Sequence, residues 1–306
     1  MLAVQIVAIA AVLTAILAMV AKALRYMTAP ESMRWELYPV PHEKGRAEYG
    51  GSYLEELDWW TKPRHSDKLN ELKEMAAEII LLKGVFHHNR RVWTSSFPFH
   101  LGMYLCIAWF GLLLLGAIIE VTGGAVGASA GWFGRVVNVL TIVTGYAGLI
   151  LAGLGALGLF LWRVTDTKQR PYNAPIDYFN LVFFVVVTAV TLTAHLGGDQ
   201  SFAVLRAFVG STITFTAAVI PPGLYQLELY LIAVLIAWIP LTRMSHFVAK
   251  YFLYHDVRWN DTPNERGSKI EKRIASLLEE KVGWSAEHMH PGKTWGDAIT
   301  EAKTDE

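Results

Sequence analysis

Histidine is the residue whose type and placement in this sequence could support cofactor chemistry. The 306 residues include ten histidines and a single cysteine, Cys106. One cysteine cannot form an internal disulfide, and it cannot hold an iron–sulfur cluster, which usually has four thiolate ligands. Any redox chemistry must therefore use another cofactor, and the histidines are its candidate ligands.

The histidines separate into two groups by their position along the chain. Seven lie in polar regions: His42, His65, His87, His88, His255, His288 and His290. The other three, His100, His195 and His246, lie in or at the ends of long apolar stretches. An ionisable side chain inside a membrane is costly, so each of these three is a candidate functional residue.

Long apolar stretches dominate the sequence and must position these histidines. The chain is 53% hydrophobic and 18% charged, against roughly 25% charged residues in an average soluble protein. A membrane core about 30 Å thick needs roughly 20 apolar residues of helix. Five stretches qualify, at 2–21, 98–119, 136–162, 178–196 and 227–249. We predict an all-α integral membrane protein with five transmembrane helices.

Two apolar segments have more than one possible interpretation. The first stretch lacks a preceding basic region, and Lys22 and Arg25 follow it, so we expect a retained helix rather than a cleaved signal peptide. Residues 202–220 are only moderately apolar and contain Arg206, and two prolines follow. We interpret them as an interfacial or re-entrant piece on the outer face.

The distribution of basic residues predicts the orientation. With five spans, 25 of the 27 lysines and arginines fall on one side, and only Arg135 and Arg206 lie opposite. The positive-inside rule makes the basic side cytoplasmic and places the N-terminus outside. The formal net charge is zero, so nothing suggests a nucleic-acid partner.

The cytoplasmic side is predicted to carry a long loop and a tail. The loop has helical spacing of apolar residues at 66–88, and the tail has a short amphipathic helix at 265–282. Such helices lie on a membrane surface or dock a partner. The predicted parts are a first transmembrane helix at 1–24, a loop at 25–96, a four-helix bundle at 97–250 and a partner-docking tail at 251–306.

His100 and His246 are predicted to lie at the same depth near the cytoplasmic face. The second span leaves that face at His100, and the fifth returns to it at His246. Two neutral imidazoles on facing helices can supply both axial ligands of a haem iron. Arg243, Arg90 and Arg91 could pair with its propionates. The alternative is that the histidines only form hydrogen bonds at the interface.

Two stretches resemble the gamma-subunit family of respiratory nitrate reductase. They are Phe97-Pro-Phe-His-Leu-Gly-Met103 and Ile239-Pro-Leu-Thr-Arg-Met-Ser-His246, in which an arginine precedes the ligand histidine. The resemblance is clearest over 97–255. The long loop and the tail are similar to the branch paired with heterodisulfide-reductase-like iron–sulfur subunits.

The resemblance implies a function in electron transfer. It predicts a cytochrome b subunit of a quinone-linked respiratory oxidoreductase complex, multi-pass in the cytoplasmic (inner) membrane of a prokaryote. Haem b would carry electrons between menaquinone, or another quinone, and a cytoplasmic iron–sulfur subunit. No residue is predicted to perform covalent catalysis. The alternative is a haem-free membrane anchor that docks a soluble enzyme.

The sequence departs from the diheme members of the family at the outer haem. The positions of its two histidine ligands are occupied here by Phe110 and Glu228, so we predict one haem b. The loss leaves space near Phe110, and Glu228 and His195 fall on the same outer side, where they could accept protons from a quinol. Glu228 is roughly 27 Å of helix from His246, so a quinone ring would have to reach inward toward Phe110 or bind near the haem. The other interpretation places Glu228 in interfacial water and makes His195 a cap of its own helix.

Overall fold

The computed structural model describes residues 2–30, 57–58, 61–62, 68–252, 265–286 and 289–300. His42, His65, His255 and His288 lie outside these residues. Within them the secondary structure is helical, with two isolated β-bridges in the tail. By contact the chain divides into two compact units. The first comprises Met1–Ala15 and Met75–Ile239, and the second comprises Ile16–Glu74 and Pro240–Glu306.

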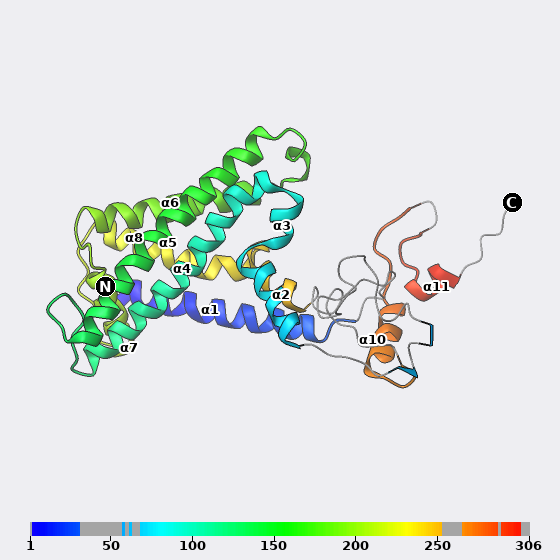
Figure 1. Ribbon diagram of the computed structural model, residues 1–306, viewed down its shortest axis with the longest axis horizontal. Helices are drawn as coiled ribbons and strands as arrows, with labels where there is room; N and C mark the ends of the chain where they lie inside the picture. The colour runs from blue at the N-terminus through cyan, green and yellow to red at the C-terminus, as the bar shows by residue number, and fades with distance from the viewer. Residues whose placement is uncertain are drawn as a thin grey trace. The chain divides into compact units, whose positions relative to one another are not determined.

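Five of the described helices are long and apolar enough to cross a membrane, as the sequence predicted. They are α1 (Leu2–Met27), α4 (Arg90–Val121), α5 (Trp132–Thr165), α6 (Pro175–Leu196) and α8 (Leu224–Leu241) (Figure 1). Helix α4 begins eight residues before the predicted span because the Asn89 side chain accepts a hydrogen bond from the backbone nitrogen of Val92. Most of their surface is apolar and exposed, as expected of helices that face lipid.

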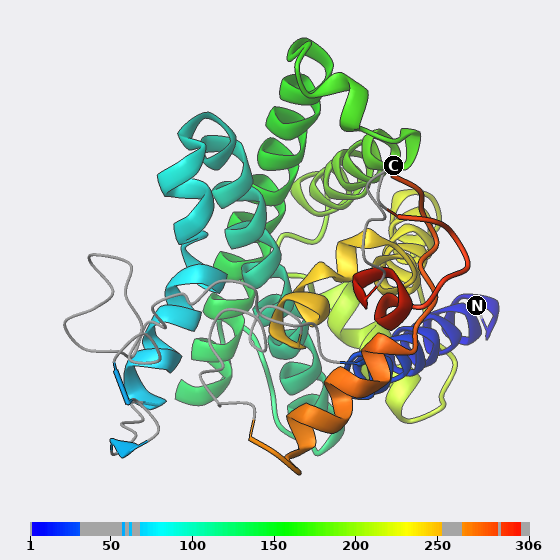
Figure 2. The ribbon, with the colours of Figure 1, turned by 90° about the vertical axis from the view of Figure 1, so that its right-hand side faces the viewer.

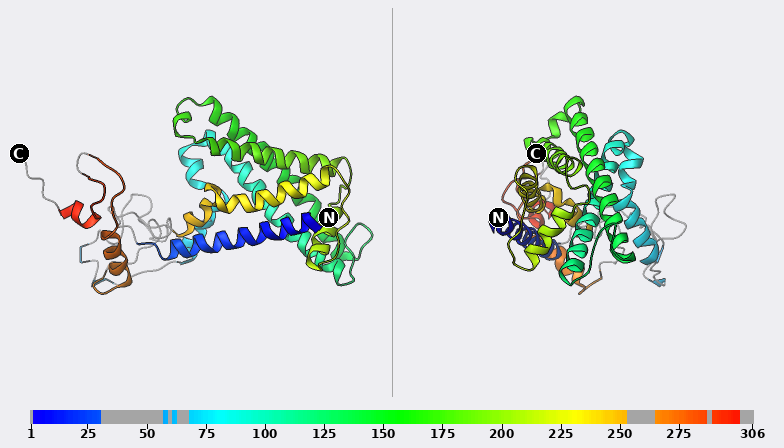
Figure 3. Two further views of the ribbon diagram at one scale, coloured as in Figure 1. Left: turned by 180° about the vertical axis from the view of Figure 1, so that it is seen from behind. Right: turned by 90° about the vertical axis from the view of Figure 1, so that its left-hand side faces the viewer.

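Glycines allow α4 and α5 to pack backbone against backbone. A Cβ atom on Gly102 of α4 would lie 2.3 Å from the backbone nitrogen of Ala152 on α5, and one on Gly155 would lie 2.4 Å from that of Phe99. Small residues of this kind are typical of close helix pairs in membranes. Figure 3 shows α5 with α6 at its side, and these two helices are also in contact.

Gly102→Ala is expected to destabilise the first unit, because its methyl group would force apart two backbones. Overpacking of this kind typically costs about 1–3 kcal/mol. Gly111→Ala on the same helix is the matched control, since a Cβ there meets nothing within 4 Å and alanine favours a helix over glycine. Thermal unfolding in detergent measures both. Equal midpoints for the two variants would contradict the close packing.

Segment 202–220 does not form a sixth span. It contains α7 (Ala203–Ile213), whose 11 residues rise only about 16 Å. Arg206 of α7 is 4% exposed, and its Nε donates to Glu120 Oε1 at 2.8 Å. A second guanidinium nitrogen donates to the Val126 carbonyl at 3.2 Å. This ion pair compensates the buried cation and fixes α7 against the end of α4.

The fifth span ends earlier than the predicted residue 249. Helix α8 stops at Leu241, and a 3-10 turn, Arg243–Ser245, leads into the short helix α9, His246–Ala249. Pro240 lacks a backbone N–H, and Thr242 has extended backbone angles, so the helix cannot continue. His246 therefore lies beyond α8 rather than in its last turn.

The helices expected in the polar regions are shorter than predicted. Residues 66–88 form α2 (Lys68–Ile80) and α3 (Lys83–His88), separated at Leu82, whose φ is 52°. The tail forms α10 (Lys269–Leu278) and α11 (Trp295–Thr300) (Figure 2). The Ser268 hydroxyl, which accepts from the Glu271 nitrogen, sets the start of α10.

Candidate functional site

The structure brings His195 and Glu228 into direct contact. His195 lies in the last turn of α6 and Glu228 in the second turn of α8. Both side chains are 0% exposed, and His195 Nε2 lies 3.2 Å from Glu228 Oε1. Glu228 is therefore buried among the helices of the first unit and not in interfacial water.

The imidazole of His195 is held in one orientation by the chain that follows α6. Its Nδ1 lies 2.7 Å from the backbone oxygen of Asp199. A carbonyl oxygen can only accept, so Nδ1 must carry a proton and donate it. The contact between Nε2 and Glu228 then contains one shared proton, held either by the carboxyl or by the ring. This local bond also agrees in part with the alternative that His195 caps its own helix.

Asp199 is itself fixed by several hydrogen bonds. Its Oδ1 accepts from the nitrogen and hydroxyl of Ser201, and its Oδ2 accepts from the nitrogen of Val204. Its own backbone nitrogen donates to the Tyr225 hydroxyl at 2.7 Å. These bonds hold the carboxylate near the histidine, with Oδ2 4.0 Å from Nδ1.

Aromatic rings enclose the pair. The His195 ring lies 4.5 Å from that of Phe202 and 5.3 Å from that of Tyr225, between ring centroids. Phe202 is fully buried and has a left-handed backbone, with φ 57°, at the start of α7. Two buried oxygens in these helices, Glu228 Oε2 and Thr191 Oγ1, form no hydrogen bond of ordinary geometry among the described residues, although the Thr191 hydroxyl interacts with the Glu228 carboxyl. The sequence interpretation missed Asp199, Tyr225 and Thr191, although Asp199 and Thr191 are each four residues from His195.

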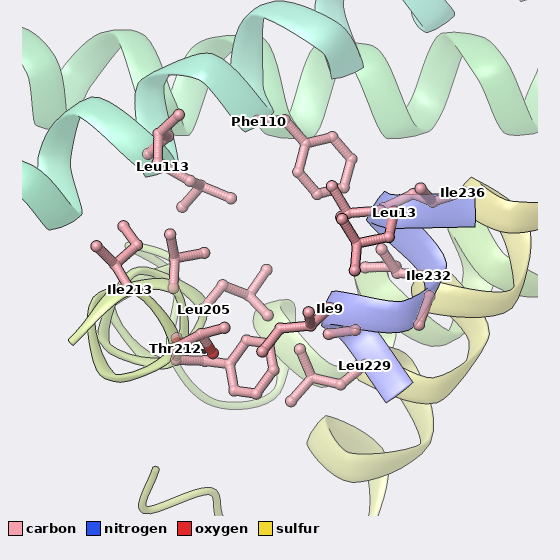
Figure 4. A pocket seen from close by; sticks show the side chains of 16 residues that line it. Ile9, Leu13, Phe110, Leu113, Leu205, Thr212, Ile213, Leu229, Ile232 and Ile236 are labelled. Carbon is pink, nitrogen blue, oxygen red and sulfur yellow. Dashed lines mark hydrogen bonds between the residues drawn. The ribbon is translucent and has the colours of Figure 1, made fainter. Parts of the chain in front are cut away.

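Phe110 lies in a different place, on the wall of an apolar cavity of about 460 Å³ (Figure 4). Side chains of α1, α4, α7 and α8 line it, and Thr212 supplies the polar side chain among them. The Thr212 hydroxyl already donates to the Phe208 carbonyl at 2.8 Å. Helix α8 thus directs Leu229 toward the cavity and the preceding Glu228 toward His195. The cavity suits a hydrocarbon group rather than a hydrogen-bonding head group.

His100 and His246 share one local geometry. His100 Nδ1 lies 2.7 Å from the Ser96 carbonyl oxygen, and His246 Nδ1 lies 3.3 Å from the Arg243 carbonyl oxygen. In both residues Nδ1 must donate, which places the ring's lone pair on Nε2. That is the tautomer in which a histidine binds iron through Nε2, with a hydrogen bond from Nδ1 orienting the ring. The donor chemistry of both residues therefore fits a haem.

The two histidines belong to different units. His100 is half-buried in α4 of the first unit. In the second unit His246 is exposed, and Lys22 fixes the turn before it by donating to the Thr242 carbonyl at 3.2 Å and to the Ser245 hydroxyl at 2.5 Å. Their predicted pairing around one iron stays a prediction.

The arginines expected near a haem are exposed. Arg90 and Arg91 form the first turn of α4, and the Arg90 guanidinium lies 4.1 Å from the centre of the Phe86 ring. Arg243 begins the turn that leads to His246. Arg243 is thus three residues before His246, whereas Arg90 and Arg91 are ten and nine residues before His100 on the same helix.

Comparisons with protein-family models, with curated proteins and with solved structures find no match to this chain. The resemblance to membrane cytochromes b therefore depends on the motifs around His100 and His246. What the structure adds is five helices that are long and apolar enough to cross a membrane, with a buried His195–Glu228 pair and an apolar cavity in the first unit.

Proposed function

We propose that this protein is a membrane cytochrome b subunit that transfers electrons between a quinone and a soluble redox partner. The observation that carries the proposal is the shared geometry of His100 and His246. In each, Nδ1 donates to a carbonyl oxygen three or four residues earlier, which leaves the lone pair on Nε2.

His100 and His246 would hold the haem, and Arg243, Arg90 and Arg91 would neutralise its propionates. When bound, haem b supplies a one-electron redox centre. The carbonyls of Ser96 and Arg243 keep the two rings oriented, and a second-shell hydrogen bond of this type also makes the imidazole a stronger ligand. The half-buried position of His100 among apolar helices would keep water away from this ligand.

The remaining parts of the proposal concern the partners. Menaquinone or another quinone would enter from the lipid, and the cavity beside Phe110 offers it an apolar site. The soluble partner would be a cytoplasmic iron–sulfur subunit of the heterodisulfide reductase type. It would dock on the side that carries most of the lysines and arginines, where the loop and the tail lie. The membrane would be the inner membrane of a prokaryote, with the N-terminus outside.

Haem content of the purified full-length protein tests the proposal. We expect one haem b per chain and a reduced-minus-oxidised spectrum of a low-spin, bis-histidine haem. Reduction by a quinol should produce the same spectrum. Protein that is inserted in the membrane but contains no haem, even when haem is supplied during expression, would refute the function and favour the haem-free anchor.

A further inference from the structure

We propose that Glu228, His195 and Asp199 form a proton relay that leads from the interior of the first unit to water beyond the end of α6. The inference depends on the proposed function, because the proton donor is the quinol whose electrons the protein would accept. Its basis is the chain of contacts from Glu228 Oε1 to His195 Nε2, and from His195 Nδ1 to Asp199.

The His195–Glu228 pair holds two protons at rest. Nδ1 of His195 carries one, and a second is shared between Nε2 and Oε1 over 3.2 Å. The pair has no net charge in this state, which is the state that a fully buried site favours. It can take up one more proton, at the second carboxyl oxygen of Glu228, and it then becomes a cation that must discharge.

The entrance of the relay is the second carboxyl oxygen of Glu228. This oxygen is buried and forms no hydrogen bond of ordinary geometry among the described residues, and its polar neighbour is the Thr191 hydroxyl, one turn before His195. An unsatisfied buried oxygen is costly, and natural proteins usually retain one for a functional reason. A hydroxyl group on a ligand can donate to Oε2, which is the contact that precedes proton transfer.

The exit for the proton is the Asp199 carboxylate. Asp199 Oδ2 lies 4.0 Å from His195 Nδ1, and the Asp199 side chain is 15% exposed. A small movement of either group would bring them into hydrogen-bond contact, and the carboxylate already reaches water. Tyr225 acts here as a positioning residue, because its hydroxyl accepts from the backbone nitrogen of Asp199.

Among the described residues, the polar groups that surround the relay include no cation. They come from four helices and the loop after α6: Trp109 on α4, Tyr146 on α5, Thr191 on α6, Tyr225 on α8, and Asp199. Asp199 is the one charged group of this set. Its negative charge favours release of a proton from His195 toward the outside end.

A proton from a quinol hydroxyl enters the pair at Glu228 Oε2, and the shared proton moves to His195 Nε2, which makes an imidazolium beside a neutral carboxylic acid. The Nδ1 proton then passes to Asp199 and on to water. Before the next passage the Glu228 carboxyl must rotate, which turns its proton toward the imidazole and frees Oε2, and the imidazole ring must flip, which returns its remaining proton to the side of Asp199. Two passages remove both protons, while the two electrons leave one at a time through the one-electron carrier of the proposed function, and quinone is the product.

The test measures haem reduction in the purified full-length protein by a short-chain naphthoquinol across a range of pH. Glu228→Gln is expected to slow it at least about tenfold and to flatten its pH dependence, since an amide cannot carry the proton. Glu228→Asp should restore part of both. Asp166→Asn is the matched control, because this carboxylate lies in the loop after α5, outside the relay, and an asparagine can keep its hydrogen bond from the Lys168 nitrogen. An unchanged rate and pH profile in Glu228→Gln would refute the relay and leave the proposed function intact.

Infrared titration of the same proteins without quinol separates failure of the proton relay from failure of the proposed haem function. The wild-type protein and Asp166→Asn should show a pH-dependent carbonyl band of a protonated carboxyl, shifted in heavy water, that Glu228→Gln lacks. This readout requires no haem, so it tests the pair even if the haem assignment fails. If Glu228→Gln does not accumulate in the membrane, Glu228→Asp must move the band. A band that is the same in every variant would refute the relay.

Discussion

Replacement of His100 or His246 with alanine is expected to abolish haem binding while the protein still inserts into the membrane. Each ring would supply one of two axial ligands, and alanine offers no nitrogen. The low-spin spectrum should be lost completely in both single variants, because a haem with one histidine ligand would no longer be low-spin. The haem-to-protein ratio and the reduced-minus-oxidised spectrum of purified protein measure it.

Two further variants make this test specific. His88→Ala removes an exposed histidine at the end of α3 and should leave the spectrum unchanged. Ser96→Ala should also retain the haem, because the His100 ring contacts the Ser96 carbonyl at 2.7 Å and its hydroxyl only at 3.4 Å. A full low-spin spectrum in both His100→Ala and His246→Ala would show that other residues bind the haem.

The membrane-spanning helices could be predicted from sequence because an apolar run of sufficient length has few other stable structures. Their ends were less accurate, since they depend on single residues. Asn89 starts α4 with a side-chain hydrogen bond, and Pro240 ends α8 before His246 is reached. Both signals are visible in the sequence, but their effect depends on local backbone angles, as the left-handed Leu82 between α2 and α3 also shows.

The candidate site could be predicted only in part. Topology placed His195 and Glu228 on one side of the membrane, but it could not reveal that their side chains touch. The same limit applies to Arg206 and Glu120, which are 86 residues apart and form a buried ion pair. Such contacts depend on how the helices are rotated about their axes. An apolar run in lipid does not determine that rotation, because most of its faces are hydrophobic.

Ala8→Phe is expected to slow electron transfer from a long-chain menaquinol at least about tenfold, because its ring would occupy the cavity beside Phe110. Ala8 belongs to the part of α1 that lies in the first unit. The walls are almost wholly hydrocarbon, so they have little to offer a polar head group and are suited to an isoprenoid chain. The short-chain naphthoquinol should therefore be oxidised at nearly the normal rate by the same variant.

Ile6→Phe is the matched control for this experiment. Ile6 lies two residues earlier on α1, is 56% exposed and is absent from the cavity wall, so the added ring would face away from it. The haem spectrum should be normal in both variants, which separates a blocked substrate site from a damaged bundle. Equal slowing of the long-chain and short-chain quinols by Ala8→Phe would mean that the cavity holds the quinone ring itself. No slowing of either would place the quinone elsewhere in the protein, with the surface near the haem ligands as the next region to probe.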